Sequence, residues 1–166
     1  MKKRNAALWA AIALTVLLIA GCSGNGDEEN SSNGGVSVSV NEDEKSVTVE
    51  NANGTTTLSG SNERPELFPE EIPLPDGAVI SASLENADKG SSMVTFEVER
   101  DFESVVKLYA DYVAGSGYVE ALPTTSEAES YWFSGNRDQE ALVITLNKDL
   151  ERDGWTSGAV TYQKAP

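Results

Sequence analysis

Most of the chain after residue 35 alternates apolar and polar residues with a period of two, and this pattern limits the fold more than any other feature. It begins as Val-Ser-Val-Ser-Val at 36–40 and recurs with other β-branched and aromatic residues. Such alternation predicts strands with one buried face, which pair most simply in an antiparallel sheet. We predict strands at 36–40, 46–49, 55–58, 78–84, 94–98, 118–122, 130–134, 141–147 and 155–163.

One stretch follows a helical period instead. Asp101 is placed to cap its start, Glu103 lies in the first turn, and Gly115 or Gly117 can end it. We predict an α+β domain over 78–166, in the order ββαββββ, with the helix on one face of the sheet. The apolar stripe of the helix should lie in the core; it consists of Phe102, Val105, Val106, Tyr109, Tyr112 and Val113.

The two segments before this domain have different compositions. Residues 35–60 hold the valine-rich strands, with turns at 41–44 and 51–54, and we predict a small β-meander appended to the domain. Residues 61–77 hold four of the six prolines, interleaved with Leu67, Phe68, Ile72 and Leu74. Proline disfavours both a helix and a central strand, so we predict an extended strap lying along the domain. A proline-rich recognition motif is the alternative for this segment.

The first 34 residues are organised as an export signal and a spacer. Three basic residues (2–4) precede an uncharged, mostly apolar run at 6–20, which is too short to span a bilayer. The run ends at Ile19-Ala20-Gly21-Cys22, and residues 22–34 are then polar and glycine-rich. We predict a signal peptide over 1–21, followed by a flexible tether that spans roughly 20 Å.

The run with its terminal cysteine resembles the lipobox of bacterial lipoproteins. The resemblance implies cleavage between Gly21 and Cys22, and attachment of a diacylglycerol thioether and acyl chains such as palmitate to Cys22. It also implies anchoring on the extracytoplasmic side of the cell membrane. Ser23 would permit sorting to the outer membrane in a cell with two membranes. A free or structural cysteine beside a signal anchor is the alternative.

The charge and the residue types limit partners and chemistry. The formal charge is −15, and loss of the three basic residues in 1–21 makes it −18, so nucleic acid is an unsuitable partner. The chain has no histidine and only one cysteine. The commonest general base and the usual ligands of zinc, iron and copper are therefore missing. We expect neither a cofactor nor enzymatic activity.

Two motifs are candidates for binding. Asp149, Glu151 and Asp153 precede Gly154 with the spacing that begins a calcium loop, but Val160 occupies the position of the closing glutamate. Turn formation before a strand is the simpler interpretation.

The other candidate is aromatic. Strand alternation places Trp132 on the face opposite Tyr131 and Phe133. We expect the meander or the strap to cover Trp132. If it is instead exposed, Trp132 and Trp155 form a candidate binding surface for a glycan or an envelope protein.

The segments FPEEIPLPDGAVI and DFESVVKLYADYVAGSGY resemble a module of small envelope lipoproteins of unknown function. We predict a membrane-anchored, non-enzymatic binding or structural module of the cell envelope. A calcium-responsive envelope domain that uses the acidic loops is the alternative.

Overall fold

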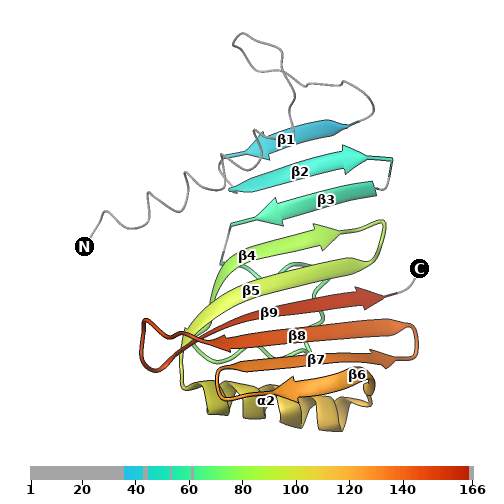
Figure 1. Ribbon diagram of the computed structural model, residues 1–166. Coiled ribbons are helices and arrows are strands. Elements are labelled where there is room, and N and C mark those ends of the chain that lie inside the picture. Colours follow the sequence, from blue (N-terminus) through green and yellow to red (C-terminus); the bar gives the residue numbers. More distant parts are fainter. Residues whose placement is uncertain (1–35, 43–44, 53, 61, 165–166) are drawn as a thin grey trace.

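The computed structural model describes residues 36–42, 45–52, 54–60 and 62–164. The signal peptide, Gly21, Cys22 and the tether predicted from the sequence lie outside this part of the chain. Within it, the protein is a single open sheet of nine antiparallel strands with one helix (Figure 1). No helix of the described part is both long and apolar enough to cross a bilayer.

The strands lie in the order β1-β2-β3-β4-β5-β9-β8-β7-β6. Three of them precede the strap: β1 (Ser37–Asn41), β2 (Ser46–Asn51) and β3 (Gly54–Ser59). The other six are β4 (Val79–Asn86), β5 (Ser91–Glu99), β6 (Val119–Ser126), β7 (Ser130–Arg137), β8 (Glu140–Lys148) and β9 (Trp155–Lys164).

The predicted antiparallel sheet with one helix is confirmed, but its organisation differs from the prediction. The described chain is mostly β, so the α+β class fits only loosely. The predicted meander pairs edge to edge with the domain, because β3 pairs with β4 from Thr56↔Asn86 to Ser59↔Ser83. A β-ribbon whose apolar face is made only of valines and one leucine gains little alone, and pairing with an existing sheet edge satisfies its backbone groups.

The helix α2 (Phe102–Ser116) has the predicted caps. The Asp101 carboxylate accepts a hydrogen bond from the backbone N–H of Ser104 at 2.9 Å, and Gly117 ends the helix with φ +80°. Only glycine adopts this left-handed conformation without strain. The helix lies against β8 and β9 and buries Phe102, Val105 and Tyr109, so the predicted stripe is part of the core.

The proline-rich strap also lies in this core, but it is not extended as predicted. It forms successive turns, in which the N–H groups of Phe68, Ile72 and Ala78 each donate to the carbonyl of a proline three residues earlier. Each of these prolines is the first residue of its turn and supplies the carbonyl that accepts the hydrogen bond. Because the prolines are separated along the chain, one turn can follow another. Phe68 and Ile72 are 2% and 0% exposed and belong to one cluster with Tyr109 and Phe96.

Both covering elements lie on the same face of the sheet. The buried strand residues alternate along each strand, as in Val94, Phe96 and Val98 of β5, and they contact α2 and the strap in one cluster. Figure 1 shows the strap as the green trace behind β4, β5 and β9. Glycine makes room on this face: Gly158 of β9 lies opposite Phe96, and a Cβ atom there would collide with the Phe96 ring.

Candidate functional site

The face of the sheet opposite the helix carries an apolar row that crosses all nine strands. Partners directly opposite in an antiparallel pair point to the same face, so the row can be followed through the register. It runs Val40, Val47, Leu58, Leu84, Met93, Thr161, Val143, Ser134 and Leu122. Only Thr161 and Ser134 interrupt it. We call this row the apolar row and its side of the sheet the open face.

No described residue outside the sheet covers the open face at the apolar row. The strap and α2 lie on the other face, and β1–β3 extend the sheet sideways. The expectation that the meander or the strap would cover Trp132 is therefore wrong. The physical reason is that the strap carries large apolar side chains, which the helix-side core accommodates, while the meander completes its hydrogen bonds only at an edge. Val40 and Leu122 remain 64% and 57% exposed at the two ends of the row.

The two predicted tryptophans lie on the open face. Tyr131 and Phe133 are buried on the helix side, so Trp132 between them points to the open side, where it is half-buried and lies opposite Thr145. Trp155 pairs with Glu99 and shares its face with Thr161 by strand alternation. The Arg152 guanidinium lies over the Trp155 ring at 4.5 Å. Trp132 is therefore the better candidate of the two for contact with a partner.

The acidic loop at 149–154 is organised as a turn. The Asp149 carboxylate accepts hydrogen bonds from the backbone N–H groups of Glu151 and Arg152, and it pairs with the Arg152 side chain at 2.5 Å. These hydrogen bonds, the one from Glu151 first, lower the pKa of Asp149. Arg152 also pairs with Glu97 at 3.0 Å. A calcium ion would have to displace this arginine, and the described residues contain no group of three acidic, histidine or cysteine side chains arranged to hold a metal.

A second polar cluster, which the sequence did not predict, surrounds Glu140 at the turn between β7 and β8. Its carboxylate accepts hydrogen bonds from Arg137 Nε at 3.0 Å, from Arg137 Nη2 at 2.5 Å and from the Tyr162 hydroxyl at 2.9 Å. The same guanidinium lies over the Tyr118 ring at 4.6 Å and is 3.5 Å from Glu71 of the strap. The cluster thus ties the strap, β7, β8 and β9 together.

The electrostatics of this cluster do not suit proton transfer. The hydrogen bond from Arg137 lowers the pKa of Glu140, and burial with the Glu140 contact raises the pKa of Tyr162 to about 12. Burial also raises the pKa of Tyr118. The pKa of each of these groups is therefore shifted away from neutral pH, whereas a general acid or base works best with a pKa near the operating pH.

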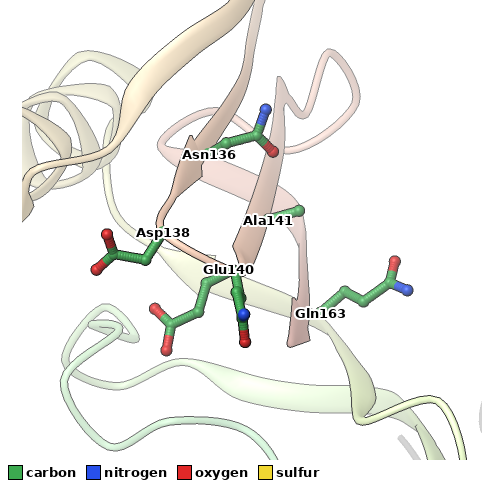
Figure 2. Close-up of a pocket in the computed structure, with 6 residues that line it drawn as sticks. Asn136, Asp138, Glu140, Ala141 and Gln163 are labelled. Carbon is green, nitrogen blue, oxygen red and sulfur yellow. The ribbon is translucent and has the colours of Figure 1, made fainter. Parts of the chain in front are cut away.

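A shallow pocket adjoins the cluster. Figure 2 shows Asn136, Asp138, Glu140, Ala141 and Gln163 around it, and Gln139 completes its lining. The Glu140 carboxylate is already engaged by Arg137 and Tyr162, and the pocket is too open and too small in lining surface to enclose a ligand. The open face is therefore the stronger candidate site.

Comparison with known proteins adds no template for either surface. No family model, no curated protein and no solved structure matches the chain.

The sequence had no signal for two of these features. Tyr118, Arg137 and Tyr162 are each about twenty residues apart, and only the successive pairing of β6, β7, β8 and β9 brings them together. The apolar row likewise depends on register, since each strand contributes a single residue to it. The alternation in each strand was the available signal, but it does not tell which of two faces is covered.

Proposed function

We propose that this protein is a lipid-anchored, extracytoplasmic, non-enzymatic binding module of the cell envelope, and that the open face around Trp132 is its binding surface. The observation that carries the binding function is the apolar row, with half-buried Trp132 beside it, on a face that no other described element covers at the row. Contiguous exposed apolar surface is uncommon on a monomeric soluble domain and marks interaction sites.

The anchor is supported by the order of residues at the start of the chain. Basic residues, an uncharged run of fifteen residues and Ile19-Ala20-Gly21-Cys22 occur in sequence before a polar spacer. A thioether-linked diacylglycerol contributes about 0.8 kcal/mol for each buried CH₂ group, so two chains hold a protein at a membrane where one does not.

A non-enzymatic role is supported by the chemistry of the described surfaces. The Glu140 cluster holds its charges in fixed pairs, and the loop at Asp149 is occupied by Arg152. An uncovered sheet face with an aromatic side chain suits a glycan or another protein, because aromatic rings stack on apolar faces of sugars and supply large contact areas.

The anchor can be tested by growing cells with a traceable fatty acid. The wild-type chain should incorporate the label and sediment with membranes, whereas Cys22→Ala should incorporate none. Ser23→Ala is the matched control and should be labelled as the wild type. Label retained in Cys22→Ala, or a processed wild-type chain in the cytosol, would contradict the anchor.

The binding surface can be tested by co-sedimentation with purified cell-wall glycan and by photo-crosslinking in cells from position 145, which lies opposite Trp132 on the same face. Trp132→Ala should abolish co-sedimentation or the crosslink, with a nearly unchanged melting temperature. Lys107→Ala, on the solvent side of α2 with 73% of its side chain exposed, is the control and should behave as the wild type. If Trp132→Ala destabilises the chain as much as a core substitution, Trp132 is part of the core and the binding surface is disproved.

A further inference from the structure

The two edges of the sheet differ in whether they can accept another strand. At one edge, the pairing of β6 with β7 shifts register twice, and β6 contains Pro123 and Glu120. Bulges, proline and charge are the devices by which proteins block strand addition at an edge. At the other edge, β1 pairs with β2 in an unbroken register from Ser37 to Asn41 and contains neither proline nor charge.

The sequence of β1 is complementary to itself. Around Ser39, Val38 and Val40 lie on one side of the strand, and Ser37 and Asn41 lie on the other side with Ser39. An antiparallel copy centred on Ser39 therefore places Val38 opposite Val40 of the second copy, and Ser39 opposite Ser39. This is the register that pairs the whole length of the strand.

We propose that β1 is a dimerisation edge at which a second copy of this chain adds its own β1 in antiparallel register centred on Ser39. Three observations favour a second copy over an unrelated strand. The edge is self-complementary, it is uncharged in a chain with a formal charge of −15, and its exposed valines lie at the end of the apolar row.

The symmetry of this pairing has a consequence for the open face. Two antiparallel strands in one sheet are related by a two-fold axis perpendicular to the sheet, so both open faces lie on the same side. The two valine pairs at the junction join the apolar rows of the two copies into one surface. The dimer does not require the lipid anchor or a ligand.

The test is site-specific disulfide formation in the full-length chain, with Cys22→Ala to leave one thiol. Ser39→Cys should give a disulfide-linked dimer under mild oxidation, because the pairing places this residue opposite itself. Ser37→Cys is the matched control on the same strand and the same face. It lies two positions from the axis, beyond the ~7 Å that a disulfide can bridge between Cα atoms, and should give roughly ten-fold less dimer.

Charge exchange tests the register independently. In the Ser39→Cys chain, V38K/V40K puts like charges opposite one another and should abolish crosslinking, whereas V38E/V40K puts opposite charges in the same positions and should restore it. Equal crosslinking from Ser37→Cys and Ser39→Cys, or loss in both charge variants, would overturn the proposal. An unrelated strand on β1 would leave Ser39→Cys without any disulfide-linked dimer, which would also overturn the proposal. None of these readouts involves acylation or glycan capture, so their failure leaves the proposed function untouched.

Discussion

The two parts of the sheet, β1–β3 and β4–β9, use the same backbone pairing but differ in what lies on their helix side. In β4–β9 that side carries Phe96, Ile144 and Val160, and it is covered by α2 and the strap. In β1–β3 it carries only polar residues, mostly serine and threonine, and Thr48 and Thr57 are hydrogen-bonded through their hydroxyls at 3.1 Å. A hydrogen-bonded sheet can therefore extend well beyond the layer that buries it.

This difference separates two contributions to folding, backbone hydrogen bonding and the burial of large side chains. Backbone pairing satisfies the polar groups of β1–β3, but its net contribution to stability is modest. Burial of large side chains provides most of the free energy of folding, and among the described residues all the fully buried ones lie in β4–β9, α2 and the strap. The two parts should therefore respond very differently to substitution.

The largest effect should come from the side chain that joins both covering elements to the sheet. Tyr109 is 0% exposed, and its ring lies 6.3 Å from that of Phe96. Tyr109→Ala should lower the free energy of unfolding by about 3–5 kcal/mol, as measured by urea denaturation. The control is Tyr109→Phe, because the buried hydroxyl has no hydrogen-bond partner among the described residues. It should leave stability unchanged or raised, and a large loss in this variant would show that the hydroxyl has a partner.

A smaller loss of stability should follow from adding a side chain in the space that the Phe96 ring occupies beside Gly158. Gly158→Ala places a Cβ atom against the Phe96 ring and Leu146, and such overpacking costs about 1–3 kcal/mol. Gly115→Ala is the matched control, because nothing lies within 4 Å of a Cβ at that helical position. It should raise stability by about 0.5–1 kcal/mol through helix propensity. Equal effects of the two substitutions would contradict the described packing.

The Glu140 cluster should make the stability of β4–β9 sensitive to acid. Because the folded pKa of Glu140 is lowered, its contribution is present above the unfolded value of about 4.3 and is lost as the pH falls through the folded value. Glu140→Gln should cost about 1 kcal/mol at pH 7 and flatten the loss of stability between about pH 5 and pH 3. Tyr162→Phe should give a weaker change in the same direction. A pH profile that Glu140→Gln leaves unaltered would refute this assignment.

The smallest effect should appear in β1–β3. Val47 is half-buried on the open face, and Val47→Ala should lower the free energy of unfolding by only about 0.5 kcal/mol. Val94→Ala, at 0% exposure in β5, is the comparison and should cost several times more. Hydrogen exchange should show the amides of β2 opening more readily than those of β5 and β9. Comparable protection in all three strands would mean that the sheet unfolds as one unit.

The local elements were predictable because their signals are local. Alternation identified Val94, Phe96 and Val98 as one buried face, and Asp101 and Gly117 were recognisable as helix caps. The proline-rich segment was correctly predicted to lie along the core, but its turns were missed. Isolated prolines are compatible with both an extended chain and a series of turns, and only the burial of Phe68 and Ile72 selects between them.

By itself, the sequence determined which segments form strands, where the helix begins, where it ends to within two residues, and which side of each strand is apolar, because these depend on neighbours within a few positions. Tertiary structure alone decided that β1–β3 join the edge at β4, that the strap and α2 cover the same face, and that Arg137, Glu140 and Tyr162 meet. These outcomes depend on pairing between distant strands. In β4–β9 the register is selected by how side chains fill the space beneath the covering layer, whereas in β1–β3 it keeps the valines and Leu58 together on the open face.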